Sequence, residues 1–239
     1  MSAGERFIAE RDAIGARYAR RTRRYDPASP WVQRTAQELD RALAAWLRRV
    51  CPDGPAGRRL LEIGCGTGRN LLRFQALGFD PGCLAGNELL ADRCAEARRQ
   101  LPAAVTLFPG DALDLPTPEA SFDVVCQSLV FSSVLDREFQ QALAARMWRL
   151  VKPGGGVLWY DFTWDNPANP DVRGVPLHRV RALFPEAAVE ARRVTLAPPL
   201  ARCVTAVHPS LYGICNALPL LRTHLLCWLP KPAVTEKST

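Results

Sequence analysis

Residues 60–70 read LLEIGCGTGRN, an apolar run followed by glycines at alternate positions, Gly64, Gly66 and Gly68. The apolar part predicts a short buried strand, and the glycines predict a tight turn whose backbone lies close to a ligand. A helix is expected to begin near Arg69. This spacing suits dinucleotides and other adenosine compounds, but it also occurs in plain tight turns, so the rest of the chain has to decide.

Length and composition favour a single domain. The chain has 239 residues, of which 48% are hydrophobic and 23% charged, which is enough for one sizeable core. The net charge of +7 favours anionic partners. However, the arginines outside one N-terminal run are scattered and lack the aromatic interleaving of single-strand binders. We therefore do not expect a nucleic acid as partner.

The eight cysteines show no spacing that indicates a metal site. His208 and His224 likewise have no carboxylate or thiol nearby at ligand spacing. The sequence contains neither a secretion signal nor an apolar run of about 18 residues, the length that crosses a membrane. These features predict a cytoplasmic protein with free thiols, no metal and no membrane span.

Strands and helices alternate regularly after the glycine loop. Hydrophobic periodicity predicts helices over 70–77, 91–101, 137–151 and 175–184. Strands are expected over 60–63, 83–87, 104–109, 123–128, 157–162 and 188–198, with a Gly-rich turn over 152–156. Such alternation favours an α/β fold with a doubly wound, mostly parallel sheet and helices on both faces.

Acidic residues precede the glycines and follow the next two strands. Glu88 lies about twenty residues beyond the last glycine, where a carboxylate accepts hydrogen bonds from both ribose hydroxyls. Asp111 follows the third strand, where it can accept from the amino group of adenine. Glu62 would repel a pyrophosphate but can pair with an ammonium group. Together they favour a cationic adenosine cofactor, although Glu62 as a mere brace of the loop stays open.

The glycines, Glu88, Asp111 and the turn over 152–156 together resemble the class I, Rossmann-like methyltransferases that use S-adenosylmethionine. The resemblance covers about residues 58–162 and implies an antiparallel strand near the C-terminus. It also implies that Glu62 and the glycines hold the amino acid end of the cofactor, Glu88 the ribose, and Asp111 with the Ala112 backbone the adenine. The full implied cofactor set is Tyr25, Glu62, Gly64, Cys65, Gly66, Gly68, Asn70, Glu88, Leu89, Gly110, Asp111, Ala112 and Gln127.

The single domain, 1–239, is expected to have three parts: a helical cap (1–52), the cofactor-binding core (58–162) and an acceptor-side region (163–239) that ends in an apolar tail. Prolines predict a break in the cap at 25–30. The arginine run at 17–24 is interpreted either as a solvated helix face or as a flap over the cofactor. In the flap, Tyr18 or Tyr25 would reach the cofactor and an arginine would face a carboxylate.

The resemblance implies methyl transfer to a small molecule, and we expect oxygen as the acceptor atom. Because the methyl donor carries an excellent leaving group, a base is optional. Asp161, Tyr160 and His178 are the candidate bases, with loop bracing by Asp161 and a solvated position for His178 as alternatives. Two other functions stay open: methylation of a lipid-linked or isoprenoid acceptor, and a non-catalytic cofactor-binding module with a basic N-terminal partner surface. Oligomeric state is left open.

Overall fold

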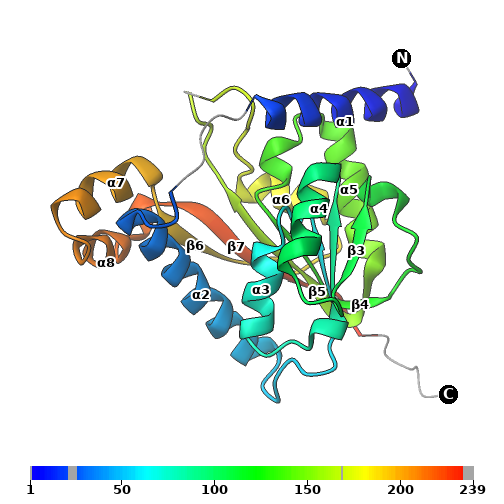
Figure 1. Ribbon diagram of the computed structural model, residues 1–239, viewed down its shortest axis with the longest axis horizontal. Helices are drawn as coiled ribbons and strands as arrows, with labels where there is room; N and C mark the ends of the chain where they lie inside the picture. Colours follow the sequence, from blue (N-terminus) through cyan, green and yellow to red (C-terminus); the bar gives the residue numbers. More distant parts are fainter. Residues whose placement is uncertain (1, 21–25, 168, 234–239) are drawn as a thin grey trace.

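The computed structural model describes residues 2–20, 26–167 and 169–233. In this part of the chain, one seven-stranded sheet has the order β3-β2-β1-β4-β5-β7-β6 (Figure 1). Its strands are β1 (Leu60–Ile63), β2 (Leu84–Glu88), β3 (Thr106–Pro109), β4 (Phe122–Ser128), β5 (Val151–Phe162), β6 (Glu190–Leu196) and β7 (Arg222–Pro230). Strands β1 to β5 pair in parallel, whereas β7 runs antiparallel to both β5 and β6. The predicted doubly wound sheet with an antiparallel strand near the C-terminus is confirmed.

Helices cover both faces of the sheet. On one face lie α2 (Pro30–Val50), α3 (Arg69–Ala76) and α4 (Ala91–Gln100); on the other lie α5 (Arg137–Leu150) and α6 (Leu177–Leu183). Helix α2 is strongly amphipathic, and its apolar stripe includes Trp46, whose ring lies 5.3 Å from that of Trp228 on β7. The apolar sides of these helices pack against the two faces of the sheet, and these contacts form the core of the domain.

Short 3₁₀ turns and two further helices complete the chain. The turns are η1 (Pro81–Cys83), η2 (Ala112–Asp114), η3 (Phe131–Ser133) and η4 (Pro219–Leu221). Between β6 and β7 the chain forms α7 (Pro198–Val207) and α8 (Leu211–Asn216), which project at one end of the molecule beside the start of α2 (Figure 1). No helix in the described ranges is long and apolar enough to cross a membrane.

The N-terminal helix α1 (Ala3–Ala19) lies apart from the sheet faces and across one edge of the fold (Figure 1). Ser2 and Glu5 form a capping box that satisfies its first backbone amides. Its buried residue Ile14 packs with Val134 and Phe139, which follow β4, and with the partly buried Leu89 after β2. Helix α1 therefore covers the carboxyl edge of the sheet at β2 and β4.

The sequence predicts a turn over the Gly-rich segment 152–156, but in the structure this segment forms the beginning of β5. The register of β5 against β4 shifts between Phe122 and Val124, which accommodates this segment. A Cβ on Gly156 would collide with the ring of Trp228, and one on Gly155 with the carbonyl of Asp123. These glycines are thus required by close neighbours across the sheet, a contact that a pattern of adjacent glycines does not reveal.

Candidate functional site

The carboxyl ends of the parallel strands bring the predicted acidic residues to one edge. Glu62 pairs in register with Gly86 on β2 and Cys126 on β4, and Glu88 ends β2 itself. Asp111 follows β3 and is held near β2 because the Gly110 amide donates to the Glu88 carbonyl over 2.9 Å. This edge is where open α/β sheets bind ligands.

Glu88 is buried, and both of its carboxylate oxygens accept backbone hydrogen bonds. Oε2 accepts from the Gly66 amide at 2.7 Å, and Oε1 accepts from the Leu90 amide at 3.0 Å. A carboxylate has about four lone-pair positions, so each oxygen retains one acceptor site. Glu88 therefore fixes the glycine loop against β2 and still has the capacity to accept from two vicinal hydroxyls.

The glycine loop approaches its neighbours closely. Gly66 has a φ of +60°, and a Cβ built there would collide with the guanidinium of Arg93 on α4. The same guanidinium lies 4.8 Å from the ring centre of Tyr18 on α1. Arg93 therefore fills the space between the loop and α1, a role that the sequence pattern did not indicate.

Asp111 is shared between its own loop and α1. Its Oδ1 accepts from the Leu113 amide at 2.9 Å, and its Oδ2 lies 3.0 Å from the guanidinium of Arg11. Burial raises the pKa of Asp111, while the Leu113 amide and Arg11 oppose that rise. The flap hypothesis places an arginine opposite a carboxylate, and at this edge Arg11 faces Asp111. Two arginines of the run at 17–24 also pair with carboxylates, Arg17 with Glu10 and Arg20 with Asp171.

Glu62 is the most unusual acid of the site. Its side chain is buried, Oε1 accepts from Asn70 Nδ2 at 2.7 Å, and Oε2 has no hydrogen-bond partner among the described residues. Burial raises the pKa of Glu62 to about 7, although Asn70 and Arg73 favour its charged form. An orphaned buried carboxylate oxygen is costly unless a ligand completes it, and a cationic ligand would do so best.

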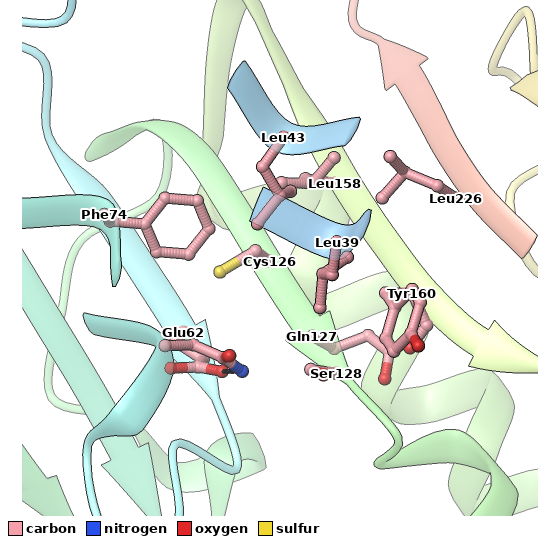
Figure 2. Close-up of a pocket in the computed structure, with 11 residues that line it drawn as sticks. Leu39, Leu43, Glu62, Phe74, Cys126, Gln127, Ser128, Leu158, Tyr160 and Leu226 are labelled. Atoms are coloured by element: carbon pink, nitrogen blue, oxygen red, sulfur yellow. Dashed lines mark hydrogen bonds between the residues drawn. The ribbon is translucent and has the colours of Figure 1, made fainter. Parts of the chain in front are cut away.

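A small cavity of about 20 Å³ lies beside Glu62, enough for one water-sized group. Figure 2 shows Glu62 and Phe74 on one side of it and Tyr160 and Leu226 on the other, with Leu39 and Leu43 contributed by α2. The complete lining is Leu39, Leu43, Glu62, Asn70, Phe74, Cys126, Gln127, Ser128, Leu158, Tyr160 and Leu226. The wall is thus largely apolar, and its polar groups come from the ends of β1 and β4 and from Asn70 of α3.

Gln127 and Asn87 fix the backbone around this cavity. Gln127 accepts from the Val130 amide at 3.0 Å and donates to the Tyr160 carbonyl at 3.3 Å. Asn87 donates to the carbonyls of Phe108 and Gly110 at 3.1 and 2.8 Å. These amide side chains hold the ends of neighbouring strands together, so the shape of the edge is set in advance.

The remaining predicted cofactor residues lie on the same edge. Gly64 has a φ of +65°, Gly68 caps the start of α3, and the Cys65 amide donates to the Asn87 carbonyl. Burial raises the pKa of the Cys65 thiol, which is therefore not a thiolate. Leu89 packs against Ile14 of α1, and Ala112 begins η2. Tyr25 lies outside the described residues.

The three candidate bases occupy different environments. Tyr160 lines the cavity, but its hydroxyl hydrogen-bonds to Thr195 Oγ1 at 2.9 Å, and burial raises the pKa of this hydroxyl. Asp161 is fully buried and accepts from the amides of Ser132 at 3.1 Å and Phe162 at 2.9 Å. His178 is exposed on α6 and does not line this cavity. A second, larger cavity lies beside Trp164, and His178 does not line that one either. Of the three, Tyr160 is in contact with the cavity.

Asp161 should make the stability of the protein fall as the pH rises. Burial raises the pKa of Asp161 to about 7, whereas an aspartate in an unfolded chain has a pKa of about 3.9. The native state therefore retains an extra proton between these values. Its stabilising contribution is complete at low pH and is lost as the pH rises through about 7. Asp161→Asn should flatten this dependence when the free energy of unfolding in urea is measured at several pH values.

Glu62 also has a raised pKa and also lowers stability as the pH rises. Asp161→Asn alone should therefore remove only part of the dependence of stability on pH. The double variant Asp161→Asn with Glu62→Gln should remove most of it. An unchanged slope in the double variant would contradict the burial of protonated carboxyl groups at this edge.

Neither a disulfide nor a metal cluster is present in the described part of the chain. All eight cysteines are free, and no group of three or more His, Cys, Asp and Glu side chains is placed to hold a metal ion.

Comparisons with known proteins agree with this geometry. Residues 60–155 match the protein family described as a methyltransferase domain. A human tRNA N(3)-cytidine methyltransferase is 30% identical over 119 residues, covering 46% of this chain and 31% of that protein. A fatty-acid O-methyltransferase of Mycolicibacterium smegmatis is 37% identical over 106 residues, covering 44% and 37%. A demethylmenaquinone methyltransferase of Deinococcus radiodurans is 32% identical over 122 residues, covering 49% of each chain.

These matches span about a third to a half of the relatives' own length. The tRNA relatives also mean that the expectation of no nucleic acid partner is not supported.

Solved structures share the fold at low identity. A SAM-dependent methyltransferase from Archaeoglobus fulgidus has a TM-score of 0.58 at 17% identity, covering 80% of this chain and 94% of that one. Phosphoethanolamine N-methyltransferase 2 of Haemonchus contortus, in complex with S-adenosyl-L-methionine, has a TM-score of 0.58 at 20% identity, covering 82% and 52%. With the strand order, the glycine loop and the acidic strand ends, these matches show that residues 60–155 form a methyltransferase domain and that the chain has the fold of S-adenosylmethionine-dependent methyltransferases.

Proposed function

We propose that this protein transfers a methyl group from S-adenosylmethionine to an oxygen atom of a small, largely apolar acceptor. The observation that carries the proposal is Glu62: a buried carboxylate with one unpartnered oxygen, beside a cavity whose wall is mostly leucine and aromatic. The carboxylate suits the cationic end of the cofactor. The cavity itself holds only a water-sized group, so its apolar side chains would form one part of a wider acceptor site.

The residues of the edge fit the cofactor by their chemistry. Glu62 would hold the ammonium group, the free acceptor sites of Glu88 the ribose hydroxyls, and Asp111 the adenine amino group. When bound, the cofactor supplies a methyl group on a sulfonium, a good leaving group. Helix α1 covers the adjoining strand ends with Ile14 and Arg11, and this cover would exclude water from the site.

Oxygen is favoured as the acceptor atom by the fatty-acid O-methyltransferase among the relatives. A carboxylate acceptor is already ionised at neutral pH, so it needs no general base. This agrees with the buried and hydrogen-bonded positions of Tyr160 and Asp161. Alignment of donor and acceptor would then be the main task of the protein.

A lipid-linked or isoprenoid acceptor is the second candidate. Leucines of α2, β5 and β7 lie beside Glu62, and an acceptor with an apolar chain suits such a surface at the edge of the site. The demethylmenaquinone methyltransferase among the relatives agrees with such a substrate class. The tRNA methyltransferases among the relatives require that a nucleic acid acceptor is tested as well.

Turnover with a panel of acceptors tests the proposal. The purified protein should transfer a labelled methyl group to medium-chain or long-chain fatty acids or to a quinol, and not to bulk tRNA. Methylation of tRNA alone would contradict the proposed acceptor class. Tight cofactor binding without product across the panel would instead favour a non-catalytic cofactor-binding module.

Cofactor binding should weaken as the pH falls, because the ammonium group pairs only with ionised Glu62. With a pKa of about 7 in the free protein, the affinity for S-adenosylhomocysteine should drop about tenfold from pH ~8 to pH ~6. Calorimetric titration should show this change in the wild-type protein. Glu62→Gln should bind weakly with little dependence on pH, and a pH-independent wild-type affinity would contradict the role of Glu62.

A further inference from the structure

The excursion between β6 and β7, residues 198–221, presents an apolar outer surface. We call this segment the α7–α8 lobe; it comprises α7, α8 and η4. Four of its large hydrophobic side chains are exposed: Val207 at 79%, Ile214 at 66%, Leu218 at 58% and Leu220 at 93%. Isolated exposed leucines are ordinary, but four large exposed hydrophobic side chains within fourteen residues are more than scattered surface residues explain.

The inner side of the lobe packs against the rest of the domain, so the lobe is an ordered part of the fold. Ala201 and Tyr212 are buried with Leu196 of β6, and Trp31 at the start of α2 packs against them. The Tyr212 hydroxyl donates to Glu38 Oε2 on α2 at 2.7 Å. The lobe is thus held on the domain through its inner face, and its apolar outer residues are left to solvent.

The charges around these side chains are positive. The lobe contains Arg202 and His208 but no aspartate or glutamate. On neighbouring elements lie Arg192 and Arg193 of β6, and Arg222, whose Nε donates to the Asn216 carbonyl of the lobe. Glu38, the acid that touches the lobe, is buried and hydrogen-bonded to Tyr212 and Thr195. The lobe therefore carries no acidic side chain, and Arg202 and Arg222 give it positive charge.

We propose that the α7–α8 lobe docks on the surface of an anionic phospholipid bilayer. Leucine, isoleucine and valine side chains enter the boundary between headgroups and acyl chains, and Arg202 and Arg222 pair with lipid phosphates. A second copy of the chain fits less well. A two-fold interface sets a surface against itself, and the arginines of the two copies would then face one another.

Docking brings the membrane close to the cavity of the proposed site. Tyr212 of the lobe contacts Glu38, and the next residue of α2, Leu39, lines that cavity. Glu38 also accepts from the Thr195 amide, and the Thr195 hydroxyl bonds to Tyr160 on the cavity wall. The inner face of the lobe is therefore linked to the cavity wall through Glu38 and Thr195.

Sedimentation of the full chain with large unilamellar vesicles tests the proposal. The protein should sediment with vesicles of equal parts phosphatidylcholine and phosphatidylglycerol, and far less with phosphatidylcholine alone. The double variant Ile214→Ser with Leu220→Ser should lower the partition coefficient by roughly tenfold or more. Arg202→Gln should weaken binding and reduce its sensitivity to salt.

Ile8→Ser is the matched control, because Ile8 is also exposed (52%) but lies on α1. It should leave vesicle binding unchanged. The proposal is wrong if the wild-type protein does not bind anionic vesicles or if the double variant binds equally well. It is also wrong if light scattering shows a dimer that the double variant disperses while vesicles bind neither protein. Since vesicle binding needs neither cofactor nor acceptor, it is independent of methyl transfer.

Discussion

The Glu88→Ala variant should bind S-adenosylhomocysteine roughly a hundredfold more weakly than the wild-type protein, or not measurably. The change removes the acceptors for two backbone amides, the buried one of Gly66 and the partly buried one of Leu90. It also removes the proposed acceptors for both ribose hydroxyls. Two or more hydrogen bonds to a charged group, at about 1.5–3 kcal/mol each, account for a loss of this size. Isothermal titration calorimetry at neutral pH is the measurement.

Controls separate ligand binding from loop structure. Glu88→Gln keeps a single carbonyl oxygen and should bind with an intermediate affinity. Asp111→Ala removes the proposed adenine acceptor but leaves the Gly66 contact intact, so it should weaken binding while the glycine loop stays in place. If Glu88→Ala and Asp111→Ala together bind as the wild-type protein does, the assignment of this edge to the cofactor is wrong.

The second large effect concerns stability and the Glu38 side chain. Glu38→Ala should lower the free energy of unfolding by about 3 kcal/mol, because the buried Thr195 amide loses its carboxylate partner and the Tyr212 hydroxyl keeps only its longer contact with Thr35. The Thr195 amide donates to the Glu38 carboxylate at 2.8 Å and the Tyr212 hydroxyl at 2.7 Å. Thr195 has a φ of +63°, a strained backbone conformation for a β-branched residue that these contacts hold in place. Urea unfolding measures the loss.

Two matched variants accompany this measurement. Glu38→Gln preserves an oxygen for the Thr195 amide and should cost much less, about 1 kcal/mol. Gln37→Ala changes the exposed neighbouring residue on α2 and should alter stability by less than about 0.5 kcal/mol. Equal losses in Glu38→Ala and Gln37→Ala would show that the buried contacts of Glu38 contribute little.

Much of the fold could be predicted because its elements are marked by local patterns. The strand predicted over 60–63 coincides with β1, and the helix predicted over 91–101 coincides with α4 to within one residue. Apolar runs and amphipathic stripes of this kind depend on burial alone. The positions of Glu88 and Asp111 at strand ends follow from the same boundaries.

The apolar tail could not be predicted in the same way. It forms α7, α8 and β7, and β7 is buried along most of its length between two strands. A strand that is buried on both faces has no alternation, so its hydrophobic run does not distinguish it from a helix. The contacts of α1 could not be predicted from the sequence either, because the pairing of Arg11 with Asp111 depends on where the whole helix lies.

The position of β7 has a consequence for synthesis on the ribosome. Residues 222–230 form an inner strand between β5 and β6, with seven residues paired along β5 alone, from Gly156 to Phe162. Until this segment emerges from the exit tunnel, β5 ends the nascent sheet with open amide and carbonyl groups, and β6 has no neighbour. Unpaired strand edges promote aggregation. Ribosome-bound chains that stop before Arg222 should therefore depend on chaperones. When β7 has left the exit tunnel, it should pair with β5 and β6 and complete the sheet in one step.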